Sequence, residues 1–298
     1  IAHSNPIPIP SVIPTEQRMN ILLHVHACKR GQCLPLLPVA ATDTDFCRSH
    51  GLMTPEPWAV PHLRVGTCFC GACGTALLKV TGRAWMPLPP PSAGPGGNNG
   101  NADEPWQAAH AAQCLLLTAL TDLPEGPLEV TARKTGHSLA WVTLSDKGAR
   151  GQRLDLSGPA IAEMIGSAMP LCHSQGFLLP DEPAQLRALL TELALGMGFD
   201  IICTTGGTGL SPRDITPQTT AALLDTPLPG FTQAMLAASL AKTPHAVISR
   251  AAAGTLGQSI IINLPGSRKA VVENLAAVLP ALPHALAKLQ GDPADCGG

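Results

Sequence analysis

The feature that most constrains the fold is an apolar segment, residues 199–203, that leads directly into the glycine-rich turn 204–209. A short continuous apolar run bounded by turn residues is typical of a strand buried on both faces of a parallel sheet. Glycines let the backbone turn tightly and approach a ligand, and successive amides in such a turn bind anions. Because ligands bind beyond the carboxyl ends of parallel strands, the segment predicts a phosphate site at one edge of a sheet.

The turn differs from two common nucleotide-binding motifs. It lacks the Gly-Lys-Ser/Thr of a Walker A loop and the spacing of Gly-x-Gly-x-x-Gly. A glycine-rich turn alone is more often a simple tight connection, but Arg213 and Asp214 follow this one closely. Since arginine neutralises phosphate charge and aspartate holds Mg²⁺, the combination favours phosphoryl chemistry.

Polar residues also follow two other predicted strands. Asp181 lies between a strand that ends at residue 179 and a helix that begins at 183, and residues 263–267 lie between the last strand and the last helix. Asp181 taken alone could equally cap its helix, a common role of aspartate. The helix that begins after residues 263–267 offers free amides to an anion. Three strand ends with ligand-type residues predict one shared site.

The C-terminal half alternates predicted strands with predicted helices, as in a parallel sheet covered on both faces. Ser157 is the expected N-cap of one helix, with Pro159 just inside it, and Pro280 and Pro283 interrupt the last helix. We therefore expect an α/β fold with a doubly wound, mostly parallel sheet. The expected strands are 139–144, 176–179, 199–203 and 259–263, and the expected helices are 158–168, 183–196, 217–224, 231–240 and 267–289.

A change of composition predicts a second domain at the N-terminus. The chain has 298 residues, more than one core usually needs, and a stretch rich in Pro, Gly and Asn is typical of a flexible linker. Upstream and downstream of it we expect strands at 21–25, 76–80 and 128–132 and a helix at 104–120. The expected divisions are a β-rich, Cys-rich region 1–85, a linker 86–105, a connecting helix and strand 106–137, and the α/β domain 138–290.

Six of the ten cysteines lie in residues 1–105, and Cys68, Cys70 and Cys73 are closely spaced. Thiolates at this spacing can bind Zn²⁺ or an iron–sulfur cluster. No second Cys-x-x-Cys pair completes a structural zinc pattern, and free cysteines are more often small buried residues. His24 and His26 could complete a metal site, although two histidines spaced two residues apart more often lie on the half-exposed face of a strand.

Charge and hydropathy exclude several classes of partner. The formal net charge is −2 and neither half has the basic stripe of a nucleic-acid binder. We find no run of 18 apolar residues free of Pro and charge, so no membrane span is expected. The first residues lack the basic start of a signal peptide, which favours a cytoplasmic protein.

The ordered motifs resemble the Mog/MoaB family of molybdopterin adenylyltransferases over roughly residues 138–289. The resemblance is carried by residues 143–147, 155–159, 180–182, 204–209, 212–217, 229–231, 248–250 and 263–267. In the N-terminal half, residues 63–67 and 76–81 resemble the end of a MOSC domain, a β-rich module.

The resemblance implies adenylyl transfer from ATP to molybdopterin with Mg²⁺, release of pyrophosphate, a homotrimer, and a molybdenum-insertion protein as a partner. It assigns Asp181 and Asp214 as catalytic, Mg²⁺-binding carboxylates. Two alternatives share the fold: a non-catalytic module that binds or carries molybdopterin, and a domain of the insertion-protein or CinA type. The implied substrate-binding residues are Ser145, Asp146, Thr204, Thr205, Gly206, Gly207, Thr208, Gly209, Arg213, Ser249, Asn263, Pro265, Gly266 and Ser267.

Overall fold

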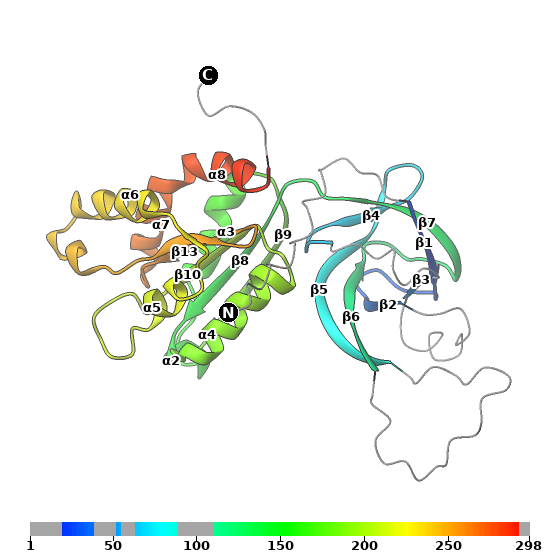
Figure 1. Cartoon of the computed structure of the whole chain (residues 1–298), viewed down its shortest axis with the longest axis horizontal. Helices are drawn as coiled ribbons and strands as arrows, with labels where there is room; N and C mark the ends of the chain where they lie inside the picture. Colours follow the sequence, from blue (N-terminus) through cyan, green and yellow to red (C-terminus); the bar gives the residue numbers. More distant parts are fainter. Residues whose placement is uncertain (1–19, 39–51, 55–62, 89–109, 292–298) are drawn as a thin grey trace, which may run out of the picture.

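The computed structural model describes residues 20–38, 52–54, 63–88 and 110–291. These residues form two units, a closed β-barrel from the N-terminal half and a six-stranded sheet with helices from the C-terminal half (Figure 1). The two units lie side by side, and the chain passes once from the barrel into the sheet, between β7 and β8.

The barrel is closed by pairing of its first and last strands, β1 with β7. Alternate side chains of β1 point inward, and residues such as Leu23, Phe69, Leu78 and Leu117 are fully buried in the barrel. The strands predicted at 21–25, 76–80 and 128–132 are confirmed. In spatial order the strands are β1 (Asn20–Val25), β3 (Leu52–Thr54), β2 (Cys33–Pro38), β6 (His110–Ala119), β5 (Ala76–Leu88), β4 (Cys68–Cys70) and β7 (Gly126–Arg133).

The helix predicted over 104–120 is wrong, because residues 110–119 form strand β6. This strand runs antiparallel to β5 along its whole length, and its Leu115 and Leu117 point into the barrel. The apolar run is compatible with both the helical and the strand period. Pairing with β5 makes it a strand. The proline- and glycine-rich stretch therefore joins two strands of one barrel, and the boundary between the units falls at residues 134–136. Residues 89–109 of that stretch lie outside the described residues.

The second unit is a doubly wound sheet, as predicted. Strands β9, β8, β10 and β13 are parallel, and β12 and β11 extend one edge in antiparallel pairing. Alternate residues face opposite sides: Leu139 and Ile201 pack on one face, Ala140 and Ile202 on the other. The strands are β8 (His137–Leu144), β9 (Leu171–Leu179), β10 (Ile201–Thr205), β11 (Thr226–Pro227), β12 (Ala253–Leu256) and β13 (Ser259–Leu264).

Helices cover both faces of this sheet (Figure 1). α3 (Ser157–Ala168), α6 (Pro229–Leu240), α7 (Arg268–Val278) and α8 (Leu282–Leu289) pack on one face. α4 (Pro183–Thr191), which continues as one π turn at Glu192–Gly196, packs on the other, and α5 (Thr216–Ala221) lies beside α4. A helix over Arg268–Leu289 is long and apolar enough to cross a membrane by composition. It is broken at Leu279–Ala281, as its prolines predict, and its buried residues pack on the sheet.

The expected N-cap of α3 is wrong in one respect. Ser157 is the first helical residue, and the carboxylate of Asp155 accepts hydrogen bonds from the amides of Ser157 (3.0 Å) and Gly158 (2.9 Å). Asp155, and not Ser157, therefore satisfies two of the free amides at the start of α3.

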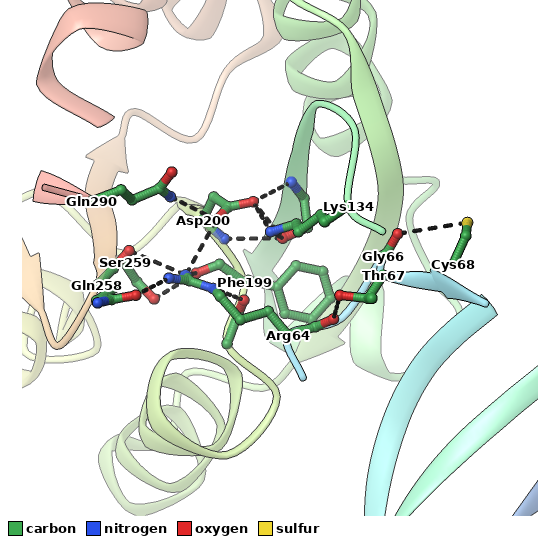
Figure 2. Close-up of polar contacts among 12 residues, drawn as sticks. Arg64, Gly66, Thr67, Cys68, Lys134, Phe199, Asp200, Gln258, Ser259 and Gln290 are labelled. Carbon is green, nitrogen blue, oxygen red and sulfur yellow. Dashed lines mark hydrogen bonds and ion pairs between the residues drawn. The ribbon is translucent and has the colours of Figure 1, made fainter. Parts of the chain in front are cut away.

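The barrel is joined to the sheet by a buried polar cluster at the amino-terminal end of β10 (Figure 2). Arg64, which precedes β4, donates to the carbonyl oxygens of Gly198 (2.9 Å) and Phe199 (3.0 Å) and forms an ion pair with Asp200. The next residue, Val65, is fully buried in the core of the α/β unit. The two units therefore share a packed interface at the amino-terminal ends of the strands, opposite the predicted site at their carboxyl ends.

Candidate functional site

Four loops meet at the carboxyl ends of the parallel strands, as the sequence predicts. They follow β8, β9, β10 and β13 and lead into α2 (Asp146–Ala149), α4, α5 and α7. A cavity of about 450 Å³ opens among the segments that follow β8, β10 and β13, and the loop after β9, which carries Asp181, contributes no lining residue. The cavity is lined by Thr143, Leu144, Ser145, Gly148, Arg153, Leu154, Asp155, Leu156, Ser157, Leu178, Thr205, Gly206, Gly207, Gly266, Ser267 and Arg268.

The glycine turn after β10 can be built only with glycines at two positions. Gly206 has φ +100°, and a Cβ atom there would lie 2.4 Å from the carbonyl oxygen of Leu144. Gly207 has φ +64°, and its Cβ would lie 2.4 Å from Oγ1 of Thr216. That hydroxyl donates to the carbonyl of Gly206 (2.9 Å), and the amide of Thr216 donates to the carbonyl of Gly207 (3.1 Å). The first turn of α5 thus holds the glycine turn against the cavity.

Two carboxylates flank this turn. Oδ1 of Asp181 lies 3.4 Å from the Cβ position of Gly207, and Oδ2 of Asp214 lies 2.8 Å from the Cβ position of Gly209. Burial raises the pKa of Asp181, and the negative charges of Asp146 and Asp214 raise it further. Paired carboxylate oxygens of this kind suit a hard divalent cation such as Mg²⁺.

Arg213 is bound by carboxylates. Its guanidinium donates to both carboxylate oxygens of Asp146 (2.7 Å each from Nη2) and to Glu182 (3.1 Å). Asp146 and Asp181 also exchange backbone-to-carboxylate bonds of 3.2 Å. Hydrogen bonding by Arg213 lowers the pKa of Asp146, and hydrogen bonding by Asp146 and Glu182 raises the pKa of Arg213. The prediction that Arg213 contacts substrate stays a prediction, and in this structure Arg213 ties three loops together.

The remaining predicted residues divide into three groups. Ser145, Thr205, Gly206, Gly207, Gly266 and Ser267 line the cavity. Thr204 and Asn263 are fully buried beneath it, where the amide of Asn263 donates to Oγ1 of Thr204 (2.8 Å), and the carbonyl of Pro265 accepts from Thr205 (2.6 Å). Thr208, Gly209 and Ser249 lie outside the residues that line the cavity. Thr204 and Asn263 therefore support the turn from below.

Sequence reasoning missed three charged residues of the cavity, Arg153, Asp155 and Arg268. Asp155 accepts a hydrogen bond from the hydroxyl of Thr143 (2.7 Å) as well as from the amides of α3. Within the described residues neither arginine forms a hydrogen bond or ion pair, so both positive charges are available to an anion in the cavity. The position of Arg268, directly after Gly-Ser at the start of the last predicted helix, was the signal that could have found it.

The part of the chain that the structure describes does not gather Cys68, Cys70 and Cys73 into a metal-binding group. Phe69 points into the barrel between Cys68 and Cys70, and Cys73 lies exposed on the following turn, hydrogen-bonded to Thr75 (3.1 Å). Among residues 20–38, 52–54, 63–88 and 110–291, no three His, Cys, Asp or Glu side chains gather around a common point. Burial raises the pKa of Cys68, which favours a protonated thiol. Cys68 and Cys70 lie within β4, whereas Cys73 lies on the exposed turn that follows, so close spacing in sequence does not bring the three thiols to one point.

Comparison with known proteins identifies the family of the C-terminal unit. A family model described as "Probable molybdopterin binding domain" matches residues 140–284. A molybdopterin adenylyltransferase of Helicobacter pylori strain J99 is 38% identical over 154 residues, which cover 51% of this chain and 86% of that protein. The chain belongs to this family.

Other members of the family differ in how much of them this chain covers. Gephyrin of Dictyostelium discoideum is 38% identical over 161 residues, which cover 51% of this chain and 22% of gephyrin. The solved structure of the molybdopterin biosynthesis enzyme MoaB from Thermus thermophilus is 44% identical, with 53% of this chain and 99% of that one covered and a TM-score of 0.49. The family match begins at residue 140, so the barrel lies outside it.

Proposed function

We propose that this protein transfers an adenylyl group from ATP to molybdopterin and releases pyrophosphate. The observation that carries the proposal is the arrangement around one glycine turn. Gly207 lines the cavity that also contains Arg153 and Arg268, and the carboxylates of Asp181 and Asp214 flank the same turn. The relatives named molybdopterin adenylyltransferase support the same reaction.

The cavity provides the groups that a terminal phosphate needs. Arg153 and Arg268 contribute positive charge, and Gly207 and the residues at the start of α7 line the cavity, where free backbone amides can donate to an anion. In the proposed complex the phosphate of molybdopterin binds here. Exposed side chains of Leu154 and Leu156 border the same cavity and offer an apolar surface to the rest of the substrate.

The reaction joins two polyanions, so the site must above all neutralise the negative charge of their phosphates. An oxygen of the molybdopterin phosphate attacks the α-phosphorus of ATP, and the bond from that phosphorus to the bridging oxygen breaks as pyrophosphate leaves. Asp181 and Asp214 are the residues that would hold Mg²⁺, which when bound screens the phosphates. The fixed amides and arginines keep the attacking phosphate in place, and such positioning lowers the barrier.

The substitution Asp214→Asn tests the proposal. Asparagine retains an oxygen that can accept the bond from the amide of Ser211 (2.8 Å), but it removes the negative charge. We expect turnover to be lost and molybdopterin binding to be kept, measured as pyrophosphate release, adenylylated product and direct titration. Asp225→Asn, an exposed carboxylate outside the residues that line the cavity, is the matched control. Turnover that survives Asp214→Asn, or tight binding by the wild type without product, would favour a carrier module instead.

We further propose a homotrimer, located in the cytoplasm, that passes its product to a molybdenum-insertion protein. The apolar surface supports self-association: α6 has one buried residue, Met235, and Leu240, Val247 and Ile248 are exposed nearby. Exposed apolar patches commonly mark protein interfaces. Light scattering after size-exclusion chromatography measures the mass, and a monomer would contradict this proposal.

A further inference from the structure

Arg250 holds both ends of the loop that carries Asp214. It lies two residues after the 3-10 helix Pro244–Ile248, and its guanidinium is directed toward the loop after the glycine turn. Nε donates to the carbonyl of Gly209 (2.8 Å), and Nη2 donates to the carbonyl of Asp214 (2.7 Å). Nη1 donates to Oε1 of Gln218 (3.1 Å). One partly buried side chain therefore connects the start of the loop, its end and the first turns of α5.

Hydrogen bonds between Ser211 and Asp214 also hold this loop together internally. The amide of Ser211 donates to Oδ2 of Asp214 (2.8 Å), and the amide of Asp214 donates to the carbonyl of Ser211 (2.8 Å). Gln218 adds a second donor to the carbonyl of Asp214 (3.0 Å). Backbone and carboxylate of Asp214 are therefore both held, and Arg250 links them to a segment 36 residues further along the chain.

We propose that Arg250 is a positioning residue that fixes the carboxylate of Asp214 for adenylyl transfer. The inference rests on the proposed function and adds a residue to its machinery. All three guanidinium nitrogens of Arg250 donate to acceptors of the loop or of α5, so it acts through the loop and not on the substrate. Its role requires the planar fork of a guanidinium, because the single ammonium of lysine cannot reach three acceptors placed in this way.

The test compares Arg250→Ala and Arg250→Lys with Arg187→Ala, a control that removes an exposed arginine from the middle of α4. For Arg250→Ala we expect kcat to fall on the order of 100-fold, the effect of a misplaced catalytic group. The affinity for molybdopterin stays unchanged, because the anion-binding cavity is intact. Arg250→Lys has an intermediate kcat, guanidinium ion added to Arg250→Ala restores part of it, and Arg187→Ala behaves as wild type.

Amide hydrogen exchange is the second readout and does not depend on activity. We expect the amides of Ser211 and Asp214 to exchange faster in Arg250→Ala, while those of β10 keep their protection. An unchanged kcat, a loss of molybdopterin affinity as large as the loss of kcat, or unchanged exchange in the loop would each overturn the proposal.

Two further outcomes are distinguishable. If wild-type protein forms no adenylylated product, the proposed function fails, and the exchange comparison still decides whether Arg250 fixes the loop. If Arg250→Ala does not fold, Gln218→Ala replaces it as the variant. Gln218→Ala removes one of the two donors to the carbonyl of Asp214 and should lower kcat less, with the same localised increase in exchange.

Discussion

The substitution Asp200→Asn removes the buried negative charge that two partly buried cations, Arg64 and Lys134, share at the junction of barrel and sheet (Figure 2). The carboxylate is 1% exposed and accepts from Lys134 (2.5 Å), from the amide and hydroxyl of Ser138 (2.6 and 2.8 Å) and from Gln290 (2.8 Å), beside Arg64 at 3.2 Å. Burial alone would raise the pKa of Asp200, but Lys134 and Arg64 outweigh it and hold that pKa below its ordinary value.

The magnitude follows from the state of the two cations after the substitution. Burial already lowers the pKa of Lys134 and of Arg64, so neither cation is well hydrated there. Removing one member of a buried ion pair leaves an uncompensated charge and costs about 3–5 kcal/mol. At about 2–4 °C per kcal/mol for a domain of this size, the melting temperature should fall by roughly 6–20 °C.

Thermal and urea unfolding of wild type and Asp200→Asn measure this loss. Asp225→Asn is the control, because it removes an exposed carboxylate that accepts a single bond, from the amide of Gly257 (2.7 Å). The double variant Asp200→Asn with Lys134→Met should recover part of the stability, since it also removes one unpaired cation. A loss below about 1 kcal/mol, as for an exposed ion pair, would refute the reasoning.

Three further predictions concern pH, the glycine turn and the thiols. Because the pKa of Asp200 is lowered in the folded protein, the stability that its carboxylate contributes is complete above its unfolded pKa of about 4 and is lost as pH falls through the folded pKa. When unfolding is measured at decreasing pH, wild type should therefore lose more stability than Asp200→Asn. Gly207→Ala, at φ +64° and against Thr216, should cost about 1–2 kcal/mol of strain and weaken molybdopterin binding, measured by titration, with an unchanged circular dichroism spectrum. Burial raises the pKa of Cys203 to about 12, whereas hydrogen bonding to Thr75 lowers that of exposed Cys73; mass spectrometry after brief alkylation of native protein should find Cys73 modified and Cys203 intact.

The location of the candidate site could be predicted from the sequence because its signals are local. An apolar segment followed by Gly206 and Gly207 predicts both a buried strand and the turn that ends it. The same local order places Asp181 and Asp214 beyond the ends of parallel strands, and the structure brings both to one turn. The catalytic and Mg²⁺-binding roles of Asp181 and Asp214 stay predictions, because the order of residues along the chain does not identify the ligand.

The cysteine cluster shows why spacing alone is insufficient. Three cysteines within six residues suit a metal site in a loop, but Cys68 and Cys70 lie in β4 on either side of the buried Phe69, and Cys73 lies exposed on the turn that follows. The sequence did not reveal that this segment pairs with β5 and β7, and that pairing fixes where each thiol points.

The sequence by itself determined the parallel α/β sheet and the carboxyl ends of its strands as the place of the candidate site, because strand period, turn glycines and helix starts are properties of neighbouring residues. The tertiary structure decided the rest. It made residues 110–119 a strand of a closed barrel, since an apolar run fits either period until a partner edge is present. It also chose the partners of Arg64 and Arg250, which are 32 to 194 residues away, because a long charged side chain acquires its acceptors only when distant segments pack together.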